Sequence, residues 1–341
     1  MQSCVGTETW LGDAPTPQGW IAFDVDDVAK AMAELTAHGY QVLVVNKHDD
    51  WQAFQLPDSN VGYYVGMNKV HLPTGQTVAY DHYGHPEAEP VVLLHGLSSN
   101  RHVYDHLATD VADQIAAGKL QLFNLDLRGH GESSHAALEQ YDAAGYASDV
   151  EAFMDRAVGR PAYVVAESLG GVIAVALAVR RPDLVRALFL EDPPLFLGDP
   201  ARRAANPIAT EFPAVIAAVR DMQARHAPIS AYEDLMRDEA APDELTALAA
   251  GMRSWDPLTM QAAIDGILWR DFDPVARLAC PVTIVGADPA HGAAFMPRDA
   301  PAILAANPAA RIVSVAGATH SVRSTASDAY MRALNIFLAS T

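Results

Sequence analysis

Apolar runs, each closed by glycine or polar residues, recur along the chain from residue 91 to the C-terminus. A run that is apolar at nearly every position, instead of alternating, is typical of a strand buried on both faces of a parallel sheet. These runs alternate with helical segments, which indicates an α/β fold whose mostly parallel sheet is covered on both faces. The predicted strands are residues 91–94, 122–127, 163–165, 187–190, 282–285 and 312–315.

Ser168 lies between one of these strands and an apolar helix predicted over residues 172–179. The residues two positions before and after it, Ala166 and Gly170, are both small. A serine between small residues at a strand-to-helix turn is typical of a nucleophile elbow, a turn so tight that bulky neighbours would clash. Glycine is the usual residue at the first of these positions, and alanine replaces it here.

Other motifs follow the strands in an order that resembles the α/β-hydrolase fold family. His-Gly at 95–96 follows the first strand, Arg-Gly-His-Gly at 128–131 follows the second, and Gly-Ala-Thr-His at 317–320 follows the last. The resemblance runs from about residue 69 to the C-terminus. It predicts an α/β-hydrolase core formed by residues 69–192 and 272–341.

The resemblance also implies roles for individual residues. Ser168 would be the nucleophile, and His320 would be the base that removes its proton. In this family the oxyanion hole is formed by backbone N–H groups, which here would come from Leu97 and Leu169. The family order of serine, acid and histidine requires a carboxylate between Ser168 and His320.

Two aspartates are candidates for that carboxylate. Asp192 follows the strand after the predicted elbow helix, 24 positions beyond Ser168, and Asp288 follows the next strand. The spacing of Asp192 and the sequence Asp-Pro-Pro-Leu-Phe at 192–196 resemble lactone hydrolases that act on resorcylic macrolides. Asp288 lies in Gly-Ala-Asp-Pro, one residue short of a common form, within a loop rich in alanine and glycine. We favour Asp192 and keep Asp288 as the alternative.

Residues 193–271 read as helices instead of a further strand layer. Helical periodicity covers residues 211–225, 231–239, 243–252 and 258–268. In the family that this chain resembles, a helical insertion at this point forms a cap that shapes the substrate pocket and excludes water. We therefore expect substrate-binding residues at the turn after the first core strand and on the underside of the cap. The candidates are His95, Gly96, Phe196 and Trp269.

Residues 1–68 have a different pattern. Strands are predicted at 20–24, 40–45, 51–56 and 61–65, with an amphipathic helix at 25–38. This βαβββ order resembles one half-module of the glyoxalase/vicinal-oxygen-chelate family. The metal ligands of that family are missing at the expected strand positions, so we expect no metal. A single half-module exposes a sheet edge and apolar surface. We expect it to pack on the hydrolase domain or on a second copy of the chain in a homodimer.

Composition and charge exclude several classes of protein. The net charge of −19 is unsuited to binding a phosphate backbone, so no nucleic-acid partner is expected. No apolar run reaches the ~20 residues that span a bilayer, and the N-terminus has no signal-peptide pattern. Two cysteines provide no disulfide framework. We therefore expect a cytoplasmic enzyme without membrane partner or cofactor.

These observations predict a serine hydrolase that cleaves a carboxylic ester or lactone through an acyl-enzyme. An apolar cap suits a hydrophobic substrate, which would be a macrocyclic lactone if the resemblance in the acid spacing extends to function. The alternatives are a carbon–carbon bond hydrolase, or an acyltransferase or perhydrolase that uses the same triad. The alternative without catalysis is a ligand-binding protein of the same fold.

Overall fold

The computed structural model describes residues 69–237 and 245–339, and five strands before residue 69. Those five strands form one sheet in the order β1-β2-β5-β4-β3. Four of them match strands predicted from the sequence, whereas the predicted helix at 25–38 lies outside the described residues. The bounds are β1 (Trp10–Leu11), β2 (Trp20–Asp24), β3 (Leu43–Lys47), β4 (Trp51–Gln55) and β5 (Gly62–Gly66).

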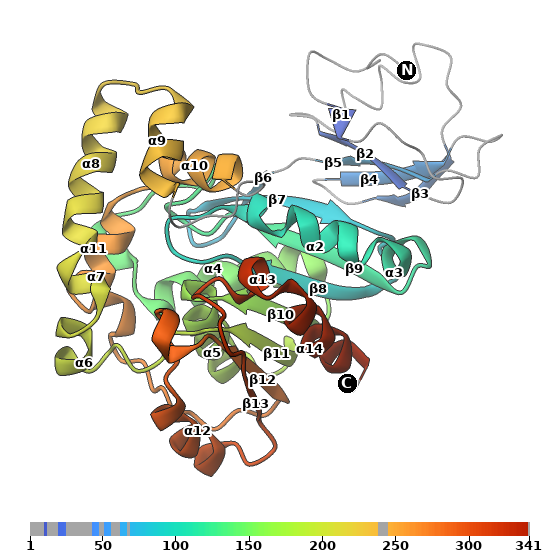
Figure 1. The fold of residues 1–341 in the computed structure, drawn as a ribbon. Coiled ribbons are helices and arrows are strands. Elements are labelled where there is room, and N and C mark those ends of the chain that lie inside the picture. Colours follow the sequence, from blue (N-terminus) through green and yellow to red (C-terminus); the bar gives the residue numbers. More distant parts are fainter. Residues whose placement is uncertain are drawn as a thin grey trace.

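An eight-stranded sheet forms the centre of the remaining chain (Figure 1). Its order is β13-β12-β11-β10-β8-β9-β7-β6, and the strands from β13 to β9 in that order are parallel. The six predicted core strands are all present, which confirms the prediction of a mostly parallel α/β sheet. Two further strands, β6 and β7, were not predicted from the sequence, and they pair antiparallel at one edge of the sheet. The bounds are β6 (Lys69–His71), β7 (Thr77–Tyr83), β8 (Glu89–Leu94), β9 (Leu120–Leu125), β10 (Ala162–Glu167), β11 (Val185–Glu191), β12 (Val282–Gly286) and β13 (Arg311–Ser314).

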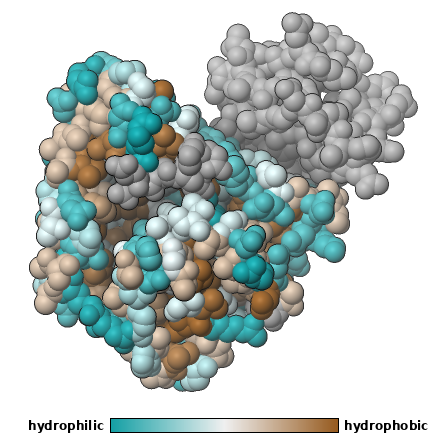
Figure 2. All heavy atoms as spheres, viewed as in Figure 1, coloured by the Kyte–Doolittle hydropathy of each residue, from teal (hydrophilic) through white to brown (hydrophobic). Residues whose placement is uncertain are grey.

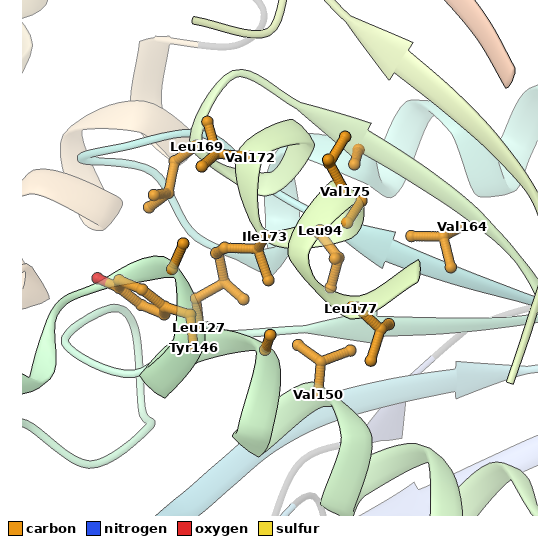
Figure 3. Close-up of a cluster of buried hydrophobic side chains, with 14 of the residues drawn as sticks. Leu94, Leu127, Tyr146, Val150, Val164, Leu169, Val172, Ile173, Val175 and Leu177 are labelled. Carbon is orange, nitrogen blue, oxygen red and sulfur yellow. The ribbon is translucent and has the colours of Figure 1, made fainter. Parts of the chain in front are cut away.

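Helices cover both faces of this sheet. On one face, Val172 and Ile173 of α5 (Leu169–Arg180) lie in one buried cluster with Val150 of α4 (Ala143–Phe153) and Leu94 of β8 (Figure 3). The opposite face is covered by a cluster that contains Tyr104, Phe189, Tyr330 and Phe337. Its helices are η1 (Arg101–Tyr104), α2 (Asp105–Asp110), α3 (Ala112–Ala116), α13 (Val322–Thr325) and α14 (Ser327–Ala339). Strands β8–β12 are therefore mostly buried on both faces, as their apolar sequences require, whereas the edge strand β13 is largely exposed.

The chain between β11 and β12 is helical and gathers at one side of the sheet (Figure 1). It has a hydrophobic core of its own, which includes Met222, Tyr232, Met252, Trp255 and Met260. The four helices predicted in this segment correspond to α8–α11. The elements are α6 (Pro200–Ala204), α7 (Pro207–Thr210), α8 (Phe212–Ala224), α9 (Ile229–Met236), α10 (Leu245–Ser254), α11 (Leu258–Ile264) and η4 (Ile267–Trp269).

Polar and charged side chains are spread over the face of the molecule shown in Figure 2, with apolar side chains in patches among them. Such a surface agrees with a chain that carries 42 acidic and 23 basic residues. None of the described helices has the length and apolar character needed to cross a membrane.

Close packing at the start of α5 depends on glycine. A Cβ atom at Gly170 would lie 2.2 Å from the Leu94 carbonyl oxygen of β8, and one at Gly171 would lie 2.7 Å from the Pro193 Cβ. Atoms cannot approach so closely, so the backbone of α5 reaches its position only because both residues lack a side chain. This contact places the turn at Ser168 against the end of β8.

We expect Gly170→Ala to destabilise the protein by about 1–3 kcal/mol or more, because the added methyl group meets a backbone oxygen that no rotamer change can move. Val179→Ala is the matched control on the same helix, since the Val179 side chain is 52% exposed and its loss should change stability by about 0.5 kcal/mol or less. Chemical denaturation measures both values. Equal stability of the two variants would contradict the packing argument.

Candidate active site

Ser168 lies between β10 and α5 in a backbone conformation that side-chain-bearing residues rarely adopt. Its φ is 48° and its ψ is −110°. The turn is held on both sides: the Ser168 N–H donates to the Glu191 carbonyl oxygen of β11 at 2.9 Å, and the Gly171 N–H donates to the Ser168 carbonyl oxygen at 2.9 Å. The serine is 8% exposed, so its hydroxyl is held in a defined place at the edge of the sheet.

Three side chains from separate segments form a continuous hydrogen-bonded relay. The His320 Nε2 atom lies 2.9 Å from the Ser168 Oγ atom, and the His320 Nδ1 atom lies 2.6 Å from the Asp192 Oδ2 atom. A carboxylate only accepts hydrogen bonds, so Nδ1 carries the hydrogen and donates to Asp192. In the neutral ring Nε2 then accepts from the serine hydroxyl, which is the tautomer that a base needs.

The Asp192 carboxylate is fixed in place by burial and by four hydrogen bonds. Asp192 is fully buried, directly follows β11, and has a φ of 39°. Besides His320, its two carboxylate oxygens accept hydrogen bonds from the backbone N–H groups of Ala287, Ala294 and Phe295, at 2.7 to 3.1 Å. These donors stabilise the charged carboxylate, which would otherwise be costly to bury.

The electrostatic surroundings of His320 favour its protonated form. Desolvation acts to lower the pKa of His320, but the hydrogen bond and charge of Asp192, with the charges of Glu167 and Glu191, outweigh that effect. The pKa is therefore raised above its ordinary value of 6.5. The His320 side chain remains 39% exposed, so protons can exchange with solvent.

Asp288, the alternative acid, lies elsewhere in the structure. Its carboxylate accepts hydrogen bonds from the N–H groups of Ala290 and Gly317, and these lower its pKa. An ion pair with His291 spans 3.6 Å. Gly317 begins the loop that leads to His320, so Asp288 supports that loop without contacting the imidazole. Of the two aspartates, only Asp192 meets His320 through a hydrogen bond that the structure describes.

The turn after β8 lies beside Ser168. A Cβ atom at Gly96 would lie 3.4 Å from the Ser168 Cβ. His95 is fully buried, and its ring accepts from the Leu127 N–H at 3.0 Å and donates to the Gly96 carbonyl oxygen at 2.7 Å. Both ring nitrogens are therefore used, and burial lowers the pKa of His95 to about 4. Against the expectation that His95 contacts substrate, the structure gives it no nitrogen to offer to a ligand.

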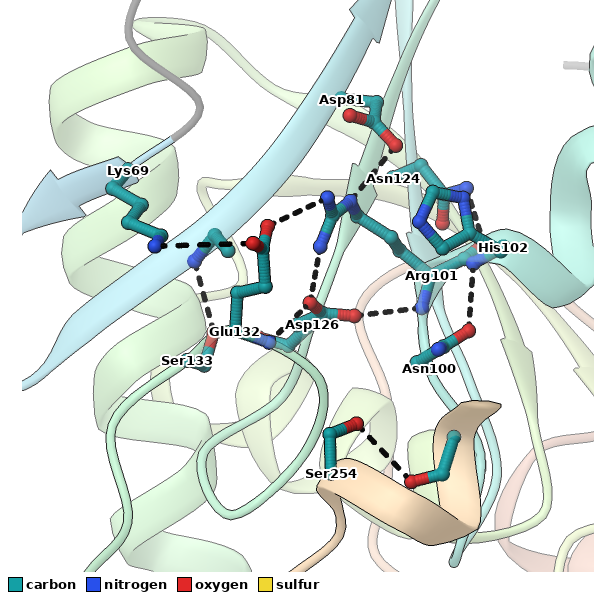
Figure 4. Close-up of polar contacts among 12 residues, drawn as sticks. Lys69, Asp81, Asn100, Arg101, His102, Asn124, Asp126, Glu132, Ser133 and Ser254 are labelled. Carbon is teal, nitrogen blue, oxygen red and sulfur yellow. Dashed lines mark hydrogen bonds and ion pairs between the residues drawn. The ribbon is translucent and has the colours of Figure 1, made fainter. Parts of the chain in front are cut away.

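A network of four charged side chains, all buried except the half-exposed Glu132, supports the same turn (Figure 4). The Arg101 guanidinium donates to Asp81 and Glu132, both at 2.9 Å, and to Asp126. Asp126 also accepts from the Arg101 backbone N–H at 2.8 Å. This network joins the end of β9 to the segment that follows Leu97, so it fixes the path of the chain next to Ser168.

Trp269 and Phe196, the two contacts expected from the cap, differ in their surroundings. Trp269 is 5% exposed, and its indole N–H donates to the Pro194 carbonyl oxygen at 3.0 Å. It therefore belongs to the main core and holds the start of the helical segment. Phe196 is partly buried against the main core, with the Arg202 guanidinium 5.0 Å from its ring centre.

Sequence reasoning missed two glutamates that the structure brings to the site. Glu167 and Glu191 are buried at the ends of β10 and β11, directly before Ser168 and Asp192. Both stand at the end of an apolar strand, where a charged residue is unusual. That break in the apolar pattern was the available signal.

Comparison with protein families gives one match that covers most of the chain. Residues 91–333 match the model of the Alpha/beta hydrolase family. That range includes Ser168, Asp192 and His320. It begins after the first 68 residues, whose resemblance to the glyoxalase family gains no support from this match.

Among curated proteins, the chain is similar to a pimeloyl-[acyl-carrier protein] methyl ester esterase of Neisseria meningitidis, with 38% identity over 106 residues. It is also similar to a protein of Wickerhamomyces anomalus named "Probable alcohol acetyltransferase", with 29% identity over 136 residues. These matches cover 31% and 36% of this chain. The chain spans 30% of the length of the esterase and 38% of that of the acetyltransferase.

Among solved structures, the fold is similar to that of the enol-lactonase from Burkholderia xenovorans LB400. The TM-score is 0.60 at 21% identity, and the match covers 80% of this chain and 99% of the other. At this level of identity the likeness concerns the fold.

The relay predicts different effects for the two candidate acids. Asp192→Asn should slow the reaction of Ser168 on the order of 10³–10⁴-fold, because an amide neither carries the charge nor keeps the imidazole in the required tautomer. Asp288→Asn should cost less than about tenfold, since Asp288 does not contact His320 and the amide oxygen can still accept from one of the two N–H groups of Ala290 and Gly317. The rate of labelling by a fluorophosphonate measures both.

Thermal unfolding of the two variants provides the control for loss of structure. A greater loss of labelling in Asp288→Asn than in Asp192→Asn, with both proteins folded, would transfer the acid role to Asp288.

Proposed function

Because the chain belongs to the alpha/beta hydrolase family, we propose that it is a serine hydrolase that cleaves a carboxylic ester or a lactone. One observation carries the proposal: the Ser168 Oγ atom lies 2.9 Å from His320, whose other ring nitrogen lies 2.6 Å from the buried Asp192. A ligand-binding protein would need neither the relay nor the strained serine.

In the first half-reaction, the Ser168 oxygen attacks the carbonyl carbon of the substrate while its proton passes to His320 Nε2. The backbone N–H groups of Leu97 and Leu169 stabilise the negative charge that develops on the carbonyl oxygen. Leu169 is the first residue of α5, so its N–H has no acceptor within the helix. The C–O bond then breaks, the leaving alkoxide takes the proton from His320, and an acyl-enzyme remains.

In the second half-reaction, water attacks the acyl-enzyme as His320 removes one of its protons. The serine oxygen leaves and recovers a proton from His320, and the carboxylic acid is released. With a lactone, the alcohol released in the first half-reaction stays attached to the acyl chain, so the product is a single hydroxy acid. Asp192 stabilises the imidazolium in both halves.

We further propose that residues 193–271 act as a cap on a core formed by 69–192 and 272–341. Leu97, Phe212 and Ile264 pack against both the main core and the core of the helical segment. A Cβ atom at Gly251 of α10 would lie 3.1 Å from the Ser99 backbone, so α10 rests on the turn that follows Leu97. This apolar contact beside the serine favours a hydrophobic acyl group, and a macrocyclic lactone is the more specific form of the proposal.

Acyl transfer is the second candidate function, and the similarity to an alcohol acetyltransferase favours it. The same acyl-enzyme would form, but an alcohol would replace water as the acceptor. Added ethanol would then increase product formation and give an ethyl ester instead of the free acid.

Hydrolysis of a substrate panel by the wild type and by Ser168→Ala tests the proposal. Nitrophenyl esters of short and long acids, simple lactones and a resorcylic macrolactone should include at least one that the wild type cleaves. Ser168→Ala should lose at least about 10³-fold in rate, because its side chain has no nucleophile. Addition of ethanol to the same assays separates transfer from hydrolysis.

The control is Ser148→Ala, which removes a hydroxyl from an exposed serine of α4. Absence of turnover of every member by folded wild type, together with no labelling by a fluorophosphonate, would contradict the serine hydrolase.

The pH dependence should follow the raised pKa of His320. Only the neutral imidazole can accept a proton, so kcat/KM should be full above that pKa and should fall as the pH drops through it, with a midpoint above 6.5. A rate profile from pH 5 to 9 on the best substrate of the panel measures the midpoint. A profile that stays flat between pH 5 and 8 would contradict His320 as the base.

A further inference from the structure

Two buried glutamates lie at the ends of the strands that lead to Ser168 and Asp192. Glu167 and Glu191 face each other as register partners in the parallel strands β10 and β11. Each precedes a residue of the relay, Ser168 or Asp192. Side chains alternate along a strand, so the two carboxyl groups point to the same face as Val165 and Phe189, opposite to α5. This is the face covered by α13 and α14.

Glu191 contacts Arg323, whereas Glu167 lies near both Arg323 and Gly96. The Glu191 Oε1 atom accepts a hydrogen bond from the Arg323 backbone N–H at 2.7 Å, and the Arg323 guanidinium lies 3.8 Å from the Glu167 Oε2 atom. Arg323 is 8% exposed and stands three residues after His320, in the first turn of α13. The Glu167 carboxyl also lies against Gly96, since a Cβ atom there would be 3.5 Å from it.

We propose that Glu167 and Glu191 are positioning residues for His320: Glu191 ties the start of α13 to the end of β11, and Glu167 holds negative charge behind the imidazole. Neither glutamate touches the reacting atoms. Glu191 acts through the helix that follows His320, and Glu167 acts through its field. The inference deepens the proposed hydrolase and rests on it for the catalytic meaning of His320, but the two contacts can be tested without any substrate.

The electrostatic surroundings of Glu167 and Glu191 include their mutual repulsion and the nearby cation Arg323. Burial, followed by the neighbouring charge of Glu167, raises the pKa of Glu191 above its ordinary value. The Arg323 guanidinium is the positive charge near the pair, 3.8 Å from the Glu167 Oε2 atom. A neutral Glu191 keeps its carbonyl oxygen as an acceptor for the Arg323 N–H.

The other titratable groups at this face are Asp192 beside His320, and Tyr104 of η1 and Tyr330 of α14. Burial raises the pKa of both phenols well above 10, so they stay neutral while His320 titrates. Neither phenol therefore changes the charge around His320 over the pH range in which the imidazole titrates.

The first test is an NMR titration of the His320 Cε1 proton, assigned by its loss in His320→Gln. Glu167→Gln should lower the pKa of His320 by about 0.5 or more, because the protonated ring loses a nearby negative charge. Glu89→Gln is the matched control, an exposed glutamate at the opposite end of β8 from the site, and should leave the pKa unchanged. Equal pKa values in Glu167→Gln and Glu89→Gln would overturn the role of Glu167.

The second test compares two variants of Glu191. Glu191→Leu removes the acceptor of the Arg323 N–H, whereas Glu191→Gln keeps it. The low-field resonance of the His320 Nδ1 proton reports its bond to Asp192, and we expect it to be lost in the leucine variant and restored in the glutamine variant. The rate of fluorophosphonate labelling should fall at least about tenfold and recover in parallel. An unchanged resonance and rate in Glu191→Leu would overturn the role of Glu191.

The two proposals fail in distinguishable ways. If the wild type cleaves no ester or lactone, the proposed function fails, while both NMR measurements still decide the roles of the glutamates. If the wild type is an active esterase and neither glutamate changes His320, the positioning role fails and the hydrolase stands.

Discussion

The site depends on one strained residue. Ser168 has a φ of 48° and a ψ of −110°, a conformation whose cost is of the order of 1–3 kcal/mol. The surrounding structure holds it there: Gly170 lets α5 approach the Leu94 carbonyl oxygen, and the Glu191 carbonyl oxygen accepts the Ser168 N–H. The strain is tolerated because three neighbouring strands and a helix are already packed by buried apolar side chains. It directs the hydroxyl away from the sheet and toward His320.

Parallel strands bring the partners of the serine to the same edge. Because β10, β11 and β12 run in the same direction, the residues that follow them emerge side by side. Asp192 comes from the strand next to the serine, and the loop after β12 supplies it with backbone donors from Ala287, Ala294 and Phe295. Asp288, from that same loop, binds the chain before His320. Asp288 therefore helps to shape the loop whose backbone N–H groups bind Asp192.

Much of this arrangement could be predicted from the sequence, and the exceptions have physical causes. The long apolar runs predicted the core strands, and the small residues around Ser168 predicted the turn. The choice between Asp192 and Asp288 stayed open because both follow a strand, and the backbone N–H groups that hold Asp192 have no signature in the sequence. Strand β7, next to the edge strand β6, was missed because Asp81 and His82 interrupt its apolar pattern. Its Asp81 is buried by pairing with Arg101, a contact between distant segments.

Glu167 and Glu191 place carboxyl groups at the buried ends of the otherwise apolar strands β10 and β11. A carboxyl group in a dry interior is costly unless it is paired or protonated, and replacing such groups by apolar ones is often neutral for stability. The Glu167–Glu191 pair differs from such a case, because the buried Arg323 contacts both carboxyl groups and would lose these partners if the glutamates alone were replaced. The pair also acts on His320, since negative charge near an imidazole stabilises the imidazolium that forms when the serine loses its proton. The same charge raises the pH at which the neutral base becomes available, so stronger stabilisation of the charged intermediate is coupled to a more alkaline working range.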